Sequence, residues 1–179
     1  MKYPIGIYEA PDEISPEMLE SWICDIEAFP HRLRAAVQNL DSEQLAWPYR
    51  PDGWMIKQVI HHCADSHMNA WMRFKLALTE DTPAIRPYNE ALWAEGADSI
   101  DDNIEPALTL LQGLHAKFGK LFRSMTEDEL QREFFHPENE TSFALVETIG
   151  NYAWHSNHHL AHVHQAIQHE GNFSRSEKQ

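Results

Sequence analysis

Two histidine-rich segments carry the strongest chemical signal in this chain. Residues 154–164 place five histidines within ten positions, and residues 61–67 hold three more of the 12 histidines in the protein. Imidazole is the commonest metal ligand among protein side chains, so two separated clusters predict one metal site closed between two parts of the chain. Only two cysteines, Cys24 and Cys63, are present. Cysteine-rich zinc folds are thereby excluded, and nitrogen and oxygen atoms must supply the ligands.

The C-terminal cluster contains two histidine pairs with a spacing of four residues. Residues four apart lie one turn apart on the same face of a helix, so their imidazoles can converge on one ion. With Leu145 at zero on a helical wheel, His155 and His159 lie at about 280° and 320°, and His158 and His162 at about 220° and 260°. The first pair points further into a buried interior. We therefore prefer His155 and His159 as ligands, with His162 as a candidate to support one of them by hydrogen bonding.

The other cluster must supply at least one further ligand, and its spacing leaves the choice open. Measured from Ile56, His67 lies near about 20°, at the centre of the apolar face, whereas His62 lies near about 240° on its flank. Periodicity alone favours His67. Asp65, one turn after His62, either orients a ligand through the second ring nitrogen or is an exposed structural acid.

Four stretches with apolar residues at helical spacing must position these histidines. Ser15 and Pro16 form a helix start signal, and Gly171 is typical of a helix end. We expect helices at about residues 16–40, 54–79, 104–125 and 143–169, and no alternating strand pattern of convincing length competes. The prediction is an all-α fold, a four-helix bundle, whose facing helices commonly build metal sites.

The connection between the second and third helices is long. It is rich in acids and contains Pro83, Pro87 and Gly96, so we expect a crossover with one short helix around residues 89–94. Such a crossover can cover a site. A capping box at residues 126–129 predicts one more short helical turn.

Length and charge limit the partners of the protein. The 179 residues predict one domain, and the 28 acidic against 14 basic residues give a formal charge of -14, which repels phosphate backbones and anionic membranes. No stretch approaches the roughly 20 apolar residues that span a bilayer. We expect a cytoplasmic protein that binds neither nucleic acid nor membrane.

Several motifs resemble the YfiT branch of the DinB superfamily. They are GW at residues 53–54, VIHHCADSHMN at 59–69, RFK at 73–75, TPAIRPY at 82–88 and WHSNHH at 154–159. The resemblance extends from residue 3 to about residue 165 and is far more specific than an isolated pair of histidines. Cys63 departs from the pattern of the branch, which has an apolar residue there, and we interpret it as a small buried hydrophobe.

The resemblance implies a four-helix bundle from a branch described as metal-dependent hydrolases, which also includes a bacillithiol S-transferase. It implies His62, His155 and His159 as the ligands, and a homodimer. It thus agrees with the pair chosen on the last helix and replaces His67, which becomes a pocket candidate. Trp54 is expected to line the same pocket. Arg86 is either an anion-binding group or an anchor of its loop.

Three neutral imidazoles leave a coordination position open, as in catalytic zinc sites. Zinc is the first expectation, although nickel or another transition metal also suits histidine nitrogen. The site then serves either hydrolysis of a small molecule or transfer of a low-molecular-weight thiol held as thiolate. No obvious glutamate stands beside the ligands as a base, which modestly favours transfer, and no catalytic side chain is assigned. A metal-stabilised module that binds a small ligand without turnover is the non-enzymatic alternative. Metal affinity is expected to fall below about pH 6.5.

Overall fold

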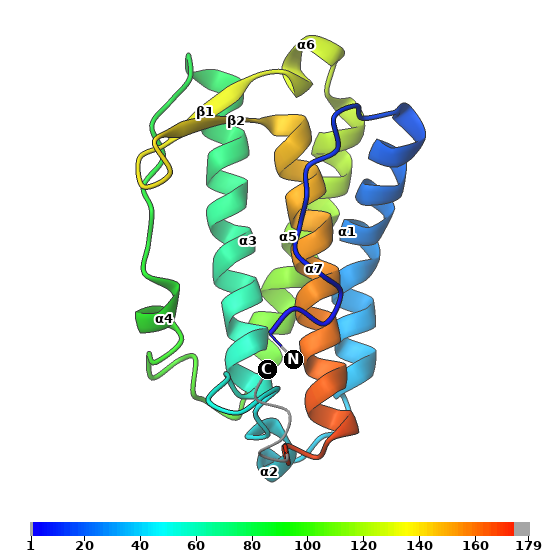
Figure 1. Ribbon diagram of the computed structural model, residues 1–179, viewed down its shortest axis with the longest axis vertical. Helices are drawn as coiled ribbons and strands as arrows, with labels where there is room; N and C mark the ends of the chain where they lie inside the picture. Colours follow the sequence, from blue (N-terminus) through cyan, green and yellow to red (C-terminus); the bar gives the residue numbers. More distant parts are fainter. Residues whose placement is uncertain (1, 174–179) are drawn as a thin grey trace.

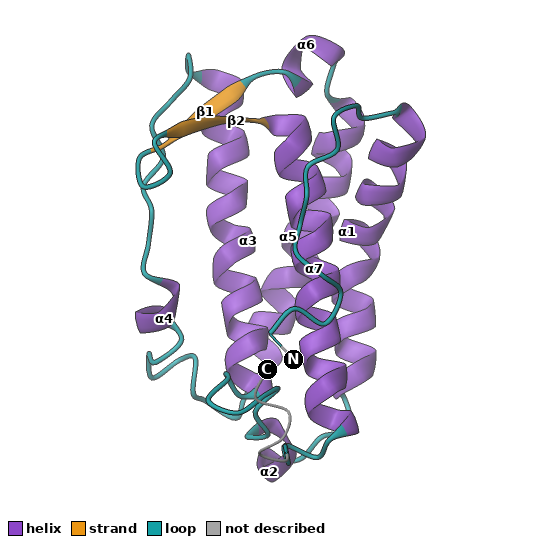
Figure 2. Cartoon of the chain, in the orientation of Figure 1, coloured by secondary structure: helices purple, strands orange, loops and turns teal. Residues whose placement is uncertain are grey.

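The computed structural model describes residues 2–173, and four long helices form its body (Figures 1 and 2). They are α1 (Pro16–Val37), α3 (Ile56–Thr79), α5 (Glu105–Ser124) and α7 (Leu145–Gln168). The expected all-α four-helix bundle is confirmed. None of the helices in the described part of the chain is long and apolar enough to span a bilayer.

The order of the helices around the bundle differs from their order along the chain. Helices α1 and α3 lie at opposite corners, and each packs against both α5 and α7. The crossover of residues 80–104 descends along the outside of α3, so that α5 starts at the same end as α3 and runs parallel to it (Figure 1). This long connection makes a parallel pair possible where a short loop would force an antiparallel one.

Three one-turn helices occupy the connections. The expected helix in the crossover is α4 (Glu90–Trp93), and the expected turn after Thr126 is α6 (Glu127–Leu130), which the predicted capping box opens. The remaining one, α2 (Ser42–Leu45), was not predicted, although Asp41 and Gln44 form a capping box there as well.

A short hairpin lies between α6 and α7, and the sequence reading missed it. Strands β1 (Glu133–His136) and β2 (Thr141–Ala144) pair antiparallel, and the backbone N–H of Ile85 in the crossover donates to the carbonyl of Phe135 at 3.0 Å. Strands of four residues are too short to show an alternating pattern. The last helix consequently begins at Leu145, two residues later than expected, because the residues before it belong to β2.

The other helix ends lie within a few residues of their expected places. Helix α1 continues through Pro30 and ends at Val37 instead of about residue 40. Helix α3 begins at Ile56, where the Gln58 side chain accepts a hydrogen bond from the Met55 N–H at 3.0 Å. The last helix ends at Gln168 with His169 as its C-cap, and Glu170, with a φ of 49°, is the first left-handed residue after it, one position before the expected Gly171.

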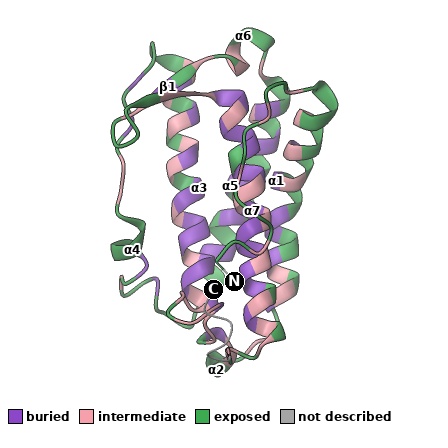
Figure 3. Ribbon diagram, viewed as in Figure 1, coloured by how far each residue is buried: buried purple, intermediate pink, exposed green. Residues whose placement is uncertain are grey.

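Buried residues follow all four long helices (Figure 3). The apolar ones form two clusters, with histidines between them. Along α3 the first cluster ends at Ala64 and the second begins at Ala70, with buried His67 in the interval. Along α7 the second cluster ends at Ala153 and the first resumes at Leu160. His155 and the neighbouring histidines of that helix fall in this second interval, so a polar layer crosses the middle of the core.

Candidate metal centre

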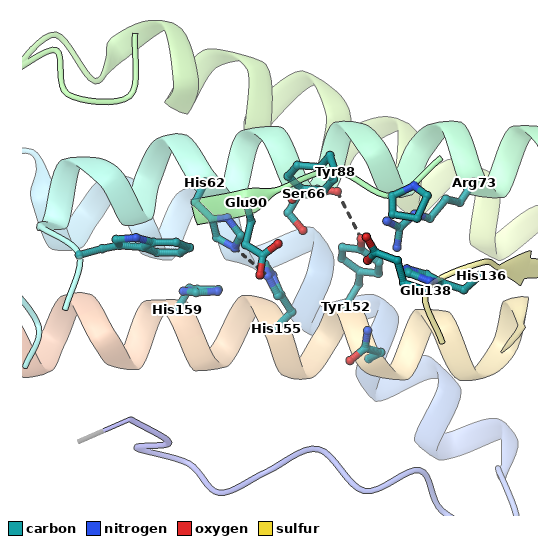
Figure 4. Close-up of a pocket in the computed structure, with 13 residues that line it drawn as sticks. His62, Ser66, Arg73, Tyr88, Glu90, His136, Glu138, Tyr152, His155 and His159 are labelled. Carbon is teal, nitrogen blue, oxygen red and sulfur yellow. Dashed lines mark hydrogen bonds between the residues drawn. The ribbon is translucent and has the colours of Figure 1, made fainter. Parts of the chain in front are cut away.

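Three histidines from two helices converge at this layer. Helix α3 supplies His62, and α7 supplies His155 and His159, whose rings lie in contact one turn apart. One ring nitrogen from each of the three lies within 4.8 Å of the others, and the Nε2 atoms of His62 and His155 are 3.3 Å apart (Figure 4).

This geometry fits a transition-metal ion. Two imidazole nitrogens bound tetrahedrally at about 2.0–2.1 Å from zinc stand about 3.3 Å apart, which matches the observed separation of the His62 and His155 nitrogens. The donor set is all nitrogen, which suits zinc, nickel, copper and iron and does not suit magnesium or calcium. The structure thus brings together the three residues that the resemblance implied.

The surroundings of the three imidazole rings favour their neutral form, which is the form that binds a metal ion. Burial lowers the pKa of His62 to about 4. Burial, and next the nearby His62 and His155 rings, hold the pKa values of His155 and His159 well below the ordinary range. A buried imidazolium would lack solvation and face other imidazoles of the same charge. The nitrogen lone pairs are therefore available at neutral pH.

Three of the expected supporting residues lie against the ligands. The Nε2 atom of His67 is 3.0 Å from Nδ1 of His155, and Nδ1 of His162 is 3.4 Å from Nδ1 of His159. The Trp54 ring packs against His62 with centroids 4.7 Å apart. His67 is buried, as its place at the centre of the apolar face predicted, but it lies behind the candidate ligand His155 and is not one of the three convergent histidines that periodicity alone favoured it to join.

Other candidates lie outside the site. Asp65 is absent from the pocket lining, and burial together with nearby Asp98 raises its pKa to about 6. Arg86 is exposed in the crossover and does not line the pocket. Cys63 is fully buried, and burial raises the pKa of its thiol, in accord with its interpretation as a small hydrophobe.

The three histidines form one end of a solvent-open pocket of about 380 Å³. Its walls come from both ligand helices, the crossover and the hairpin: Trp54, His62, Ser66, Arg73, Pro87, Tyr88, Glu90, His136, Glu138, Asn151, Tyr152, His155 and His159 (Figure 4). A second hollow of about 520 Å³ adjoins it and shares four of these residues, Arg73, His136, Asn151 and Tyr152.

Sequence reasoning missed the charged groups of this pocket. Glu90, at the start of α4, brings a carboxylate to the pocket that contains the histidines, although no glutamate stands near them in sequence. Arg73 carried a usable signal, because it lies eleven positions, about three turns, after His62 on the same face of α3. The sequence offered no such signal for Glu138, which follows the unpredicted strand β1.

The family of the chain follows from comparison with known proteins. A profile of the DinB superfamily matches residues 25–163. The chain belongs to the DinB superfamily. The matched segment includes α3 and most of α7 of this DinB protein, and it contains all three convergent histidines.

Relatives of this DinB chain carry a consistent description. "Putative metal-dependent hydrolase YfiT" of Bacillus subtilis (strain 168) is 45% identical over 163 residues, which are 91% of this chain and 92% of the relative. A protein of Bacillus cereus (strain G9842) with the same description of its activity is 46% identical over 164 residues, with 91% and 93% coverage.

Solved structures show the same fold. YfiT from Bacillus subtilis, described as a "probable metal-dependent hydrolase with an unusual four-helix bundle topology", aligns with a TM-score of 0.92 at 44% identity, covering 95% of this DinB chain and 97% of YfiT. The mycothiol-dependent maleylpyruvate isomerase aligns with a TM-score of 0.64 at 17% identity, covering 81% of this chain and 60% of the isomerase. The latter likeness concerns the fold alone.

Proposed function

We propose that this protein is a metal-dependent hydrolase that acts on a small molecule. The observation that carries the proposal is the meeting of three neutral imidazoles and a carboxylate, Glu90, in one solvent-open pocket. A divalent ion held by His62, His155 and His159 supplies Lewis acidity, which activates water and polarises the group under attack. Zinc is the ion we propose first.

Glu90 is our candidate for the general base. Its carboxylate enters the pocket from the crossover, on the side of His62 and His155 (Figure 4). The side chain of Asn89 caps α4 by accepting a hydrogen bond from the Leu92 N–H at 3.0 Å, which fixes the first residue of this short helix. A carboxylate held at this place can accept the proton of an attacking water molecule.

Arg73 indicates the charge of the substrate. Its guanidinium lies over the Phe134 ring at 5.9 Å and lines both hollows, and it forms no ion pair with another residue in the described range 2–173. A planar guanidinium that has no acidic partner among the described residues is suited to bind a carboxylate or phosphate. We propose that the substrate carries an anionic group at the junction of the two hollows.

Thiol transfer is the second candidate, and the two adjoining hollows favour it. Together they offer room for two reactants, with the histidine site at the end of one hollow. A low-molecular-weight thiol would bind at the histidine end and the electrophile at the shared wall, so that Glu90 is not required as a base.

The test compares Glu90→Gln with Glu95→Gln, a change of an exposed acid just after α4. Each variant and the parent chain, loaded with zinc, are incubated with an ester and amide panel without thiol, and separately with small thiols and an electrophile. Hydrolysis that needs zinc and Glu90 but not Glu95 supports the proposal. Zinc-dependent thioether formation that survives Glu90→Gln establishes transfer instead. The third outcome is zinc binding without turnover of any compound in either panel, together with thermal stabilisation by a small anion. This outcome would identify the non-catalytic binding module.

A further inference from the structure

Two chains of hydrogen-bonded imidazoles start at His155 and His159, the candidate ligands of α7. The first runs from Nδ1 of His155 to Nε2 of His67 at 3.0 Å, then from Nδ1 of His67 to Nε2 of His115 at 2.6 Å. It ends where Nδ1 of His115 meets the backbone carbonyl of Ile26 at 2.5 Å. The chain therefore joins α7, α3, α5 and α1 at one level of the bundle.

The carbonyl of Ile26 determines which nitrogen donates and which accepts in every hydrogen bond of this chain. A carbonyl oxygen only accepts, so Nδ1 of His115 carries the proton. A neutral His115 then has a bare Nε2, which accepts from Nδ1–H of His67. His67 in turn accepts at Nε2 from Nδ1–H of His155. The remaining nitrogen of His155, its Nε2, is left as a lone pair that faces His62.

The terminal carbonyl is available because of a proline. In an α-helix the carbonyl of Ile26 would accept from the N–H of residue 30, and Pro30 has none. The ring of His115 supplies the donor that the backbone lacks. Pro30 of α1 thus leaves open the carbonyl to which His115 of α5 donates.

The second chain is shorter, and a backbone carbonyl again fixes which nitrogens donate. The Nε2 atom of His162 lies 3.0 Å from the backbone carbonyl of Lys2, so this nitrogen carries the proton. Nδ1 of His162 is then bare and accepts from Nδ1–H of His159 at 3.4 Å. This arrangement leaves Nε2 of His159 as a lone pair, as in His155.

Burial keeps the supporting imidazoles neutral, which the directions require. His67, His115 and His162 are only 1%, 1% and 2% exposed. Phe29 packs against the first two rings, and Tyr49 stacks on His162 with centroids 3.8 Å apart. An extra proton on His115 would reverse the first chain and place an N–H on His155 where an ion must bind.

We propose that His67, His115 and His162 are positioning residues that hold His155 and His159 in the Nδ1–H tautomer, with both Nε2 lone pairs presented to the metal. The inference rests on the metal site of the proposed function. Metal-bound histidines often donate to a carboxylate, which raises their basicity. Here neutral imidazoles accept these hydrogen bonds instead of a carboxylate, and they add no negative charge. A bound ion would therefore keep more of its positive charge for Lewis acid chemistry.

The tautomers can be measured without metal or substrate. Nitrogen-15 NMR of the imidazoles in the metal-free full chain should show Nδ1–H for His155, His67, His115 and His159, and Nε2–H for His162. This mixed pattern is specific to the two chains. An Nε2–H tautomer at His155 or His159 would overturn the proposal.

Paired variants test the effect on metal binding. His115→Gln retains an acceptor near the place of Nε2, and His115→Phe removes it; His162→Asn and His162→Leu form the same contrast for Nδ1. We expect zinc affinity, measured with a competing chelator, to fall about 10- to 100-fold in the apolar variants and to recover in their amide partners. His158→Phe, a buried histidine of α7 outside both chains, is the control.

The outcomes separate this inference from the proposed function. Equal zinc affinity in the apolar and amide variants, with both folded by circular dichroism, would overturn the positioning roles and leave the metal site intact. Absence of zinc binding by the parent chain would overturn the proposed function, whereas the NMR pattern would still decide the direction of the two chains. Where an apolar variant does not fold, the NMR measurement on the parent chain alone decides.

Discussion

The imidazole of His115 occupies the place of the backbone donor that Pro30 lacks. Pro30→Ala restores an N–H four residues after Ile26, which then competes with His115 for the same carbonyl. Because a typical hydrogen bond contributes about 0.5–1.5 kcal/mol net, we expect zinc affinity to fall by a factor of about 2 to 10. Competition with a chelator measures this. An unchanged affinity would show that His115 is oriented by packing alone.

Loss of any one of the three convergent histidines should remove the metal. His62→Ala, His155→Ala and His159→Ala each leave two imidazoles, which hold an ion far more weakly than three. We expect the zinc content of the purified protein to fall from about one ion per chain to a small fraction of that. His164→Ala, a change of an exposed histidine on the same helix, should leave the content unchanged. Retention of a full equivalent in His155→Ala would contradict the assignment.

Metal affinity should persist at lower pH than ordinary histidines allow. Protons compete with metal only near the pKa of the ligand, and burial lowers the pKa of His62 to about 4. We therefore expect affinity to change little between about pH 7 and 5 and to fall as the pH approaches about 4. This revises the threshold of about pH 6.5 expected from the sequence. Titration with zinc at stepped pH values measures the profile, and a steep loss between pH 7 and 6 would contradict it.

The metal-free protein should lose stability in mild acid. Burial lowers the pKa of His115 to about 4, below the value of about 6.5 in an unfolded chain. Between these values the unfolded state binds more protons, so the free energy of unfolding falls as the pH is lowered through this window and levels off below it. The contribution is on the order of 3 kcal/mol.

Urea unfolding at pH 7, 5.5 and 4.5 measures this dependence. His115→Gln removes the titrating group and should flatten part of the profile. The same steepness in the parent chain and in His115→Gln would assign the acid sensitivity to other groups.

Arg73→Met should weaken the binding of an anionic substrate. A charge-assisted hydrogen bond to an ionised group contributes about 1.5–3 kcal/mol, so we expect KM to rise by about 10- to 100-fold with a smaller change in kcat. Arg86→Met is the matched control, because Arg86 is exposed and outside the pocket. Equal effects of the two changes would indicate a general influence of net charge on an acidic protein.

The sequence predicted the four long helices, and it predicted that His155 and His159 share one helix face, for a physical reason. Long amphipathic helices repeat the same pattern over several turns, and a spacing of four residues fixes which side chains share a face. A helical wheel, however, shows only which residues face the core. A metal ligand of a catalytic site must also lie where substrate can reach the ion. The wheel therefore placed His67 at the centre of the core correctly and could not single out His62, which required the resemblance.

The parts that the sequence did not predict depend on contacts between distant segments. Glu90 lines the same pocket as the histidines only because the crossover returns along α3. The acceptor for His115 lacks its helical donor because Pro30 lies four residues after it in another helix. Short strands such as β1 and β2 are stabilised by pairing with each other and leave little pattern in four residues.

The histidine layer between the two apolar clusters also fixes how far each helix is displaced along its axis relative to the others. Leucine and phenylalanine contacts tolerate a slip of one turn, because one apolar neighbour replaces another. The same slip of α7 would separate His155 from His67, leaving ring nitrogens buried without partners at about 1–3 kcal/mol each. A single polar position can select one alignment of a helical bundle in this way. The imidazole bonds to His155 and His159 therefore also disfavour misaligned bundles of the same sequence.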